Sequence, residues 1–523
     1  MKSKKNAALL LTAAMLVSIV TGCSSGGDSG TSTSSGSSSS ESSGTENAEK
    51  EIVEISMVHM LNPEINLKDN PVLDKIEEEL GIRLIIEAPP VNDYWTRTQV
   101  IMSTGAMPDL MLEGTDVNFE KWSSEGLLAD ITDDIQNYPN LMKNISEQQW
   151  GDTTALHDGK IYGVPRCNSY DYWGFMINKE WLENVGMEAP TTIEEFIEVC
   201  DAFTHKDPDG NGKDDTYGVS LGTEITHLRN DFISTAYNIS LHVGMPDANG
   251  EYVLNQFKSG YMDYLDTLRQ MYADNILDRE FITHKADENL EKFAQGRVGI
   301  VGASGKSYIS ELEKYDLDVT KYQYCAPLTL EEGDAPKYMM PPSNWCAFLI
   351  NADTDKKDDI LRLLDWANSE EGFILTHLGI QGEHYESYDL ETRTLVRTPE
   401  QELAVKEVCG DMFGFANAYD GRALIEGGST EESTALWREN VEAANQGVEY
   451  YYTPFVKVLF SMQSDFPDET EYLSNLEIRY VTGDADAEEL TSYIEEYGEK
   501  VQEYSAEYAA FMEENPVQIK TEA

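Results

Sequence analysis

An acidic loop in the middle of the chain has the residue types and spacing that bind a calcium ion. From Asp207 to Asp215, oxygen-bearing side chains stand at positions 1, 3, 5 and 9 and a glycine at position 6; in calcium loops position 7 adds a backbone carbonyl. An EF-hand also needs a bidentate Glu at position 12, where this chain has Gly218. The loop is therefore not an EF-hand, and a solvated loop closed by Asx turns is the alternative. The candidate ligands are Asp207, Asp209, Asn211, Lys213, Asp215 and Thr216.

The common catalytic constellations are missing from the sequence. It contains no H-E-x-x-H and no G-x-S-x-G segment. Gly305-Lys306-Ser307 ends like a phosphate loop, but the first glycine of that motif would fall at Ile300. Acidic residues are so numerous that a glycosidase pair could lie among them without a recognisable spacing. We therefore expect no enzymatic activity and keep a surface carbohydrate-active enzyme as an alternative.

The N-terminal segment has the pattern of an exported lipoprotein. Three lysines precede the apolar run from Ala7 to Val20, and Thr21-Gly22 stand directly before Cys23. This is the secretory signal pattern, and a cysteine at this place resembles the bacterial lipobox, in which that cysteine takes the lipid. We expect a signal peptide over 1–22, lipidation of Cys23 and a Ser/Gly-rich flexible tether over 23–50. An ordinary signal peptide with a chance cysteine is the alternative.

Length and charge restrict the function of the remaining chain. More than 450 of the 523 residues follow the tether, too many for one hydrophobic core, so two lobes are expected. The 95 acidic residues against 38 basic ones give a net charge of −57. This charge argues against nucleic acids, which are bound by neutralising phosphates, and against docking on anionic lipid.

The cysteines beyond Cys23 suggest neither a metal site nor a disulfide framework. Their number is odd and none forms a C-x-x-C pair. We expect most of them to be small buried residues. They are Cys167, Cys200, Cys325, Cys346 and Cys409.

Hydrophobic periodicity predicts two blocks of alternating strands and helices, and therefore the α/β class. In the first block we expect strands over 52–58, 82–86 and 109–112, with helices over 71–80 and 94–103 between them. Leu73, Ile76 and Leu80 should line the buried face of the first helix. The second block should begin with a strand over 173–177 and a helix over 179–185, followed by a capping box of Thr191 with Glu194. A tyrosine-rich amphipathic stripe from Ile494 to Phe511 should close the chain.

Several short motifs, in order along the chain, resemble those of the family 1 extracellular solute-binding proteins, in particular their longer lipoprotein branch from Gram-positive bacteria. Each motif alone is short, but together they extend from about residue 50 to 510. They are Met102–Asp109 with its Pro-Asp end, Gly126-Leu-Leu-Ala-Asp-Ile131, Asp158-Gly-Lys-Ile-Tyr-Gly-Val-Pro165, Ile177-Asn-Lys-Glu-Trp-Leu182, Pro190-Thr-Thr-Ile-Glu-Glu-Phe196, Phe293-Ala-Gln-Gly-Arg-Val-Gly299, Trp366–Gly372 and Gly379–Tyr385.

The resemblance implies a two-lobe fold of the periplasmic-binding-protein type II class, with hinge-connected lobes that close on a ligand and a C-terminal helical tail. It places the first lobe at 51–168 and 326–380, and the second lobe with the C-terminal helices at 169–325 and 381–523. It also implies structural calcium at the acidic loop, although Thr216 stands where an acid often follows in such loops.

The same resemblance implies which residues face the ligand. A sugar needs aromatic faces for its C–H side and polar groups for its hydroxyls. The family's ligand loops correspond here to Glu113, Thr115 and Asp116, then Tyr170, Asp171, Tyr172 and Trp173, then Ser304 and Lys306, then Asn344 and Trp345, with His59 and Asn62 as weaker candidates.

The resemblance implies a monomeric, lipid-anchored receptor on the extracellular face of the membrane that delivers a sugar or oligosaccharide to the permease subunits of an ABC importer. A peptide or other small solute is the close alternative as ligand. A signalling ectodomain with the same binding chemistry is a further alternative.

Overall fold

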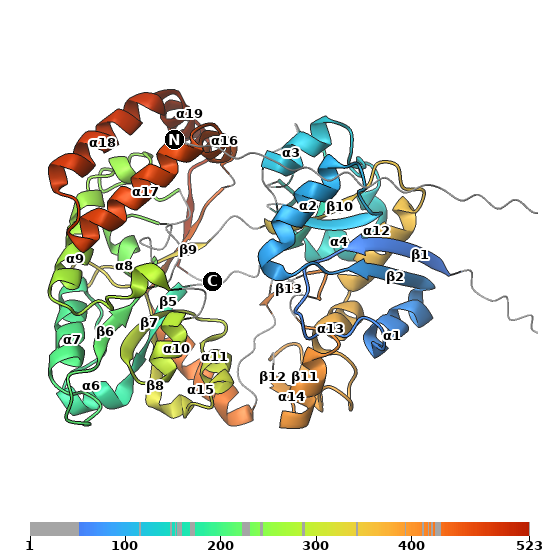
Figure 1. Ribbon diagram of the computed structural model, residues 1–523. Coiled ribbons are helices and arrows are strands. Elements are labelled where there is room, and N and C mark those ends of the chain that lie inside the picture. The colour runs from blue at the N-terminus through green and yellow to red at the C-terminus, as the bar shows by residue number, and fades with distance from the viewer. Residues whose placement is uncertain are drawn as a thin grey trace, which may run out of the picture. The chain divides into compact units, whose positions relative to one another are not determined.

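A computed structural model describes residues 52–521 except 115–116, 147–148, 152, 154–158, 168–172, 222–230, 241–243, 285–287, 341–343, 393, 411–412, 417, 420–421, 424–429 and 455. The expected signal peptide, Cys23 and the tether lie outside the described residues. Two separate sheets, each with its own helices, confirm the expected α/β class and its two lobes (Figure 1). Within the described ranges, no helix is both long and apolar enough to span a membrane.

The first lobe is built on a five-stranded sheet with the order β2-β1-β3-β10-β4. Strand β1 pairs in parallel with β2 and β3, as the strand–helix–strand spacing predicted, whereas β10 runs antiparallel to β3 and β4. The elements of this lobe are β1 (Val53–Val58), α1 (Pro71–Leu80), β2 (Ile82–Glu87), η1 (Val91–Asp93), α2 (Tyr94–Ser103), β3 (Leu110–Gly114), α3 (Val117–Ser124), η2 (Ile135–Asn137), α4 (Pro139–Asn144), β4 (Gly163–Cys167), β10 (Asn344–Ile350), α12 (Lys357–Ala367), α13 (Glu370–Leu378), β11 (Ser387–Asp389), β12 (Thr394–Val396) and α14 (Pro399–Lys406).

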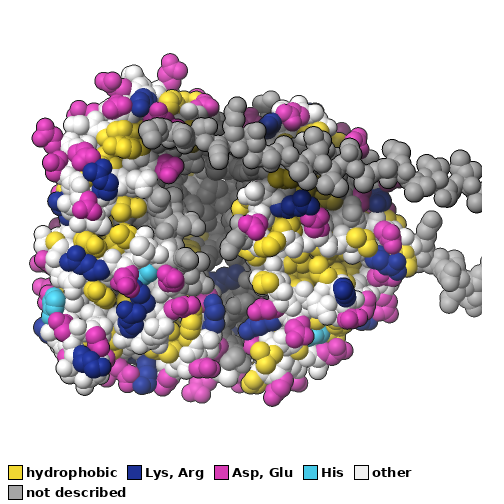
Figure 2. Space-filling view, in the orientation of Figure 1, with side chains coloured by type: hydrophobic (Ala, Val, Ile, Leu, Met, Phe, Trp, Pro, Cys, Tyr) yellow, Lys and Arg dark blue, Asp and Glu magenta, His cyan; other side chains and the backbone are white. Residues whose placement is uncertain are grey.

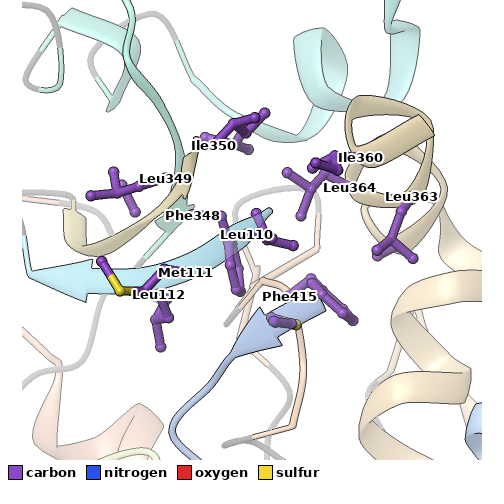
Figure 3. Packing of buried hydrophobic residues seen from close by; sticks show 14 of the residues in the cluster. Leu110, Met111, Leu112, Phe348, Leu349, Ile350, Ile360, Leu363, Leu364 and Phe415 are labelled. Atoms are coloured by element: carbon purple, nitrogen blue, oxygen red, sulfur yellow. The ribbon is translucent and has the colours of Figure 1, made fainter. Parts of the chain in front are cut away.

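The core of the first lobe lies between its sheet and α12. Strand β3 supplies Leu110, Met111 and Leu112, and β10 supplies Phe348, Leu349 and Ile350, all completely buried (Figure 3). Helix α12 adds a stripe of leucine and isoleucine side chains at helical spacing. Burial on both faces explains why these strands are continuous apolar runs rather than alternating ones.

The second lobe is built on a four-stranded sheet with the order β6-β7-β5-β8. Along β5, Phe175 and Ile177 face one hydrophobic layer and Met176 faces another, as the two-residue period of a strand requires. Helices α7 and α9 contribute to the first layer, and α10, α11 and α15 to the second. The elements of this lobe are β5 (Trp173–Asn178), α6 (Lys179–Val185), α7 (Ile193–His205), β6 (Tyr217–Ser220), α8 (Asp231–Ser234), η4 (Thr235–Tyr237), η5 (Asn255–Phe257), α9 (Tyr261–Ala273), η6 (Phe281–Thr283), α10 (Glu288–Ala294), β7 (Val298–Ser304), α11 (Tyr308–Lys314), η7 (Val319–Lys321), β8 (Tyr322–Cys325) and α15 (Glu431–Ala444).

Of the C-terminal helices, α17 packs on α9 and α18 packs on α17, and all four of them share the core of the second lobe. A small sheet with the order β16-β15-β9 and a short hairpin of β13 and β14 complete the fold. These elements are β9 (Lys337–Met340), β13 (Ala418–Tyr419), β14 (Arg422–Ala423), β15 (Glu449–Tyr452), α16 (Lys457–Asp465), α17 (Pro467–Thr482), α18 (Ala487–Lys500), α19 (Gln502–Glu514) and β16 (Gln518–Lys520).

Local end signals fix several helices where the sequence predicted them. The Asn70 side chain accepts hydrogen bonds from the first-turn amides of α1, and Gly81 ends that helix in the left-handed conformation with φ = 65°. Gly186 ends α6 in the same way with φ = 73°. Glycine suits these ends because it has no Cβ to oppose a positive φ.

Three local predictions were wrong in detail. The capping box joins Thr192 with Glu195 rather than Thr191 with Glu194, because the helix begins at Ile193. In α1, Leu73, Ile76 and Leu80 all pack toward the core as expected, but the buried Val72 was not predicted. The terminal stripe belongs to two helices, since Val501 leaves the helical conformation between α18 and α19.

The chain stays on the first lobe longer than the resemblance implied. Residues after 380 were expected to return to the second lobe. Instead α14 and the segment that follows pack on the core of the first lobe, through Val405, Val408, Cys409, Phe413 and Phe415. Phe415 contacts Phe348 of β10, with ring centroids 5.3 Å apart, so tertiary packing overrides the expected crossing.

Four cysteines confirm the prediction of small buried residues. Cys200, Cys325, Cys346 and Cys409 are buried and carry free thiols. Burial raises the pKa of Cys325 and of Cys409 to about 12, which keeps both thiols protonated and unreactive.

Candidate functional site

Strand pairing in the second lobe places two of the predicted ligand residues opposite each other. Trp173 begins β5 and pairs with Ser304, the last residue of the antiparallel strand β7. Directly paired residues project from the same face of a sheet. The Trp173 side chain is 51 % exposed although its neighbours on β5 are buried. This edge of the sheet therefore presents an exposed indole, with the buried Ser304 side chain opposite it.

The turn after β7 adds a cationic group to this edge. The Ser304 hydroxyl oxygen accepts hydrogen bonds from the backbone N–H groups of Lys306 (3.1 Å) and Ser307 (3.4 Å). These bonds fold the chain back on Ser304 and keep Lys306 close to the end of β7. The Lys306 side chain is half-buried. We call residues 304–306, together with Trp173, the second-lobe edge.

A close backbone approach fixes the position of Trp173. A Cβ added to Gly174 would lie 2.0 Å from the Cys325 carbonyl oxygen and 2.8 Å from the Tyr324 hydroxyl oxygen. Only glycine fits between β5 and β8 at this point. The tight packing at Gly174 therefore fixes the backbone directly after Trp173.

One residue that supports this edge was missed by sequence reasoning. The Trp437 indole N–H of α15 donates to the Gly305 carbonyl oxygen at 2.8 Å. Trp437 and Val441 have the four-residue spacing of a helical core stripe, which predicts burial and gives no sign of a binding edge. The contact joins residues 132 positions apart, so only the packing of α15 reveals it.

The first lobe carries a buried polar cluster at the carboxyl ends of its strands. It comprises His59, directly after β1, with Glu113 of β3 and Arg166 of β4, each at most 2 % exposed. Burial, and after it the positive charge of Arg166, lowers the pKa of His59 to about 3, so this histidine is neutral at physiological pH. Glu113 and His59 were predicted ligand candidates, and the structure places both inside the lobe. Arg166 was not predicted, although an arginine within an apolar strand sequence could have indicated a buried polar cluster, because charged residues are rarely buried.

The remaining predicted ligand residues are described in part or not at all. Thr115, Asp116, Tyr170, Asp171 and Tyr172 lie outside the described residues. Asn344 and Trp345 begin β10, where Asn344 pairs with Cys167 of β4, and only their backbone is described. Asn62 is exposed.

The acidic loop between α7 and β6 is closed by its own side chains. The Asp207 carboxylate accepts the Gly212 N–H at 3.1 Å, and the Asn211 side chain contacts both Asp209 and Asp215. Asp207 and Gly212 adopt positive φ values of 49° and 76°. These turns gather oxygen donors that suit calcium, but within the described residues no three His, Cys, Asp or Glu side chains form a metal-binding group.

Thr216 stands apart from the other candidate calcium ligands. Its side chain is buried, and its hydroxyl donates to the Phe203 carbonyl oxygen of α7 at 2.7 Å. It therefore joins the loop to the helix.

A surface cavity of about 540 Å³ lies away from all these residues, between α1 and α13. Its lining includes Lys75, Glu79, Glu371 and Tyr385. Burial, and after it the neighbouring Glu371, raises the pKa of Glu79. Glu371 lies in the first turn of α13, where the helix dipole stabilises a negative charge. The acidic residues of this cavity therefore do not by themselves indicate a ligand site.

Comparisons with known proteins agree with the motifs. The sequence profile of the bacterial extracellular solute-binding proteins matches residues 72–382. Lipoprotein LipO of Bacillus subtilis (strain 168) is 26 % identical over 359 residues, which cover 66 % of this chain and 69 % of LipO. The polygalacturonan/rhamnogalacturonan-binding protein YtcQ of the same organism is 28 % identical over 255 residues, 47 % of this chain and 49 % of YtcQ.

A third similar protein, from Streptococcus pneumoniae, has been solved with ligands. The fructooligosaccharide ABC transporter substrate-binding protein FusA is 25 % identical over 266 residues, 47 % of this chain and 48 % of FusA. Its structure with kestose superposes with a TM-score of 0.65 at 18 % identity, covering 87 % of this chain and 97 % of that chain. An EF-hand mutant of FusA with fructo-nystose superposes equally, with a TM-score of 0.65 at 16 % identity over 88 % of this chain and 98 % of that chain. The sequence alignments with YtcQ and FusA span about half the length of those proteins.

Proposed function

The chain belongs to the bacterial extracellular solute-binding proteins, and we propose that it captures an oligosaccharide outside the cell and delivers it to an ABC importer. The observation that carries the proposal is the second-lobe edge, where the half-exposed Trp173 stands opposite Ser304 and the turn after Ser304 carries Lys306. The names of YtcQ and FusA, each a saccharide-binding protein, support the choice of ligand class.

The chemistry of this edge suits a sugar ring. The indole face of Trp173 covers the C–H side of a pyranose or furanose, and burial of that apolar area drives the contact. The Ser304 hydroxyl and the Lys306 ammonium group can bond to ring hydroxyls. We propose that the protein holds its ligand without converting it, which the names of YtcQ and FusA as binding proteins support.

We further propose that the protein is an exported lipoprotein. The sequence pattern at 1–22 directs export, Cys23 carries the lipid, and residues 23–50 tether the lobes to the outer face of the membrane. The name of LipO, a lipoprotein, supports this anchor. The importer's permease subunits would then be the partners of a monomeric receptor.

The test is a titration of residues 46–523 with monosaccharides, fructooligosaccharides, oligogalacturonides and short peptides. A ligand at 100 times its dissociation constant should stabilise the fold by about 2.7 kcal/mol. Trp173→Ala should weaken saccharide binding about tenfold, whereas Tyr472→Ala, which removes an exposed aromatic side chain from α17, should leave it unchanged. Binding of peptides alone would reject the saccharide, and consumption of a saccharide would reject the receptor.

We also propose that the acidic loop binds calcium as a structural clip. Asp207, Asp209, Asn211 and Asp215 supply side-chain oxygens and Lys213 its carbonyl, as in calcium loops; a loop closed by Asx turns without metal is the alternative. Calcium added after chelation should raise the unfolding midpoint of the wild type and not of Asp209→Asn. Asp318→Asn, at an exposed turn elsewhere in the second lobe, serves as the control. An unchanged wild-type midpoint would show that the loop needs no metal.

A further inference from the structure

Helix α15 reaches the second-lobe edge from the opposite side of the sheet. Trp173 and Ser304 lie on the face of the sheet that Phe175 shares, whereas Gly174 and Ala303 face the layer that contains Trp437. Figure 1 shows α15 beside α11 and β8, and residue contacts place it there. The Trp437 side chain is 6 % exposed and packs among buried side chains of that layer.

Among the described residues, the Trp437 side chain makes its polar contact with the turn of the second-lobe edge. Its indole N–H donates to the carbonyl oxygen of Gly305, which stands between Ser304 and Lys306. Gly305 itself is buried. A bond to this peptide fixes the turn from below while the Ser304 hydroxyl fixes it from within.

We propose that Trp437 is a positioning residue for ligand binding, which acts by holding the Gly305 peptide so that Ser304 and Lys306 keep the orientation in which they meet the saccharide. This inference rests on the proposed function. A binding group that is not held in place by its neighbours lowers the affinity, because part of the binding free energy is then used to order that group.

The packing of α15 makes the role separable from folding. Val441 of the same helix is buried with Val301 and Tyr324 in the layer that contains Trp437, and this packing does not depend on the indole N–H. A capping box of Thr430 with Ser433 stabilises the start of the helix. Removing the indole N–H therefore takes one bond from the turn and leaves the helix docked.

The test compares Trp437→Phe with Trp181→Phe. Both changes replace a buried tryptophan of the second lobe, but Trp181 packs edge-on against Phe203 in the other hydrophobic layer. Both variants should lose similar thermal stability. Only Trp437→Phe should weaken saccharide binding, by about tenfold for one lost hydrogen bond.

A local measurement separates this inference from the proposed function. Hydrogen exchange at the amides of Lys306 and Ser307, which donate to Ser304, should accelerate in Trp437→Phe and not in Trp181→Phe. This readout needs no ligand, so failure of the wild type to bind any saccharide would reject the proposed function alone. Unchanged exchange in Trp437→Phe, wild-type affinity in that variant, or an equal loss of affinity in Trp181→Phe would overturn the role of Trp437.

Discussion

Asp109, in the Pro-Asp pair of the first resemblance motif, ties three segments of the first lobe together. Its carboxylate accepts the Ser56 hydroxyl of β1 at 2.6 Å, the Thr354 hydroxyl at 2.7 Å and the Lys356 ammonium at 3.0 Å. Burial alone would raise its pKa, but these bonds outweigh burial and lower the pKa of Asp109 from its ordinary value of 3.8 to about 2. The motif residue is therefore a structural junction.

The prediction at this scale concerns Asp109→Asn. Loss of the charge should lower the free energy of unfolding at pH 7 by about 2 kcal/mol, the range of hydrogen bonds to charged groups. Because the folded pKa lies below the unfolded one, this stabilisation is present above about pH 4 and disappears as the pH falls to about 2. Urea unfolding of wild type and variant should thus converge in acid. A gap that is constant from pH 7 to pH 2 would contradict the assignment.

At the scale of elements, the start of α7 shows why the N-cap is Thr192 and not the neighbouring Thr191. The Thr192 hydroxyl accepts the Glu195 N–H at 3.3 Å, and the Glu195 carboxylate accepts the N–H groups of Thr191 (2.9 Å) and Thr192 (3.2 Å). The bridge of Thr192 to Thr329 and the bond from Ile193 N–H to the Thr329 carbonyl hold the entry to the helix. Tertiary contacts therefore choose between two threonines that the sequence leaves equivalent.

The cap can be tested with two matched variants. Thr192→Ala should lower the free energy of unfolding by about 1 kcal/mol, because it removes the N-cap oxygen. Thr191→Ala, whose exposed hydroxyl only donates to Glu195, should change it by less than about 0.5 kcal/mol. Chemical unfolding of both variants measures the difference. A larger loss of unfolding free energy in Thr191→Ala would show that Thr191 is the N-cap, as the sequence predicted.

For the whole molecule, the net charge of −57 acts on stability rather than on ligand choice. Figure 2 shows acidic side chains scattered over the visible surface of both lobes without a single large patch. Like charges spread in this way repel one another and destabilise the compact state. A dispersed acidic surface of this kind fits an extracellular protein and points to no particular ligand.

Salt should therefore stabilise this protein. Raising NaCl from about 0.01 M to about 0.15 M shortens the Debye length from about 30 Å to about 8 Å. The thermal unfolding midpoint should rise by about 2 °C or more, and a chelator in every sample keeps calcium out of the comparison. A midpoint that falls with salt would mean that attractive ion pairs, such as Arg83 with Glu77, outweigh the repulsion.

The sequence by itself determined the elements whose causes are local. Asn70-Pro71 and Gly81 bound α1, and Gly186 ends α6, because caps depend on atoms within a few residues. The ordered motifs also determined the family and the two-lobe α/β class. Tertiary structure alone decided that the chain stays on the first lobe from residue 380 to Phe415, that Arg166 joins His59 and Glu113 inside it, and that Trp437 lies beneath Gly305. These contacts join positions far apart in the chain, and their formation depends on how whole layers pack, which no short stretch of sequence encodes.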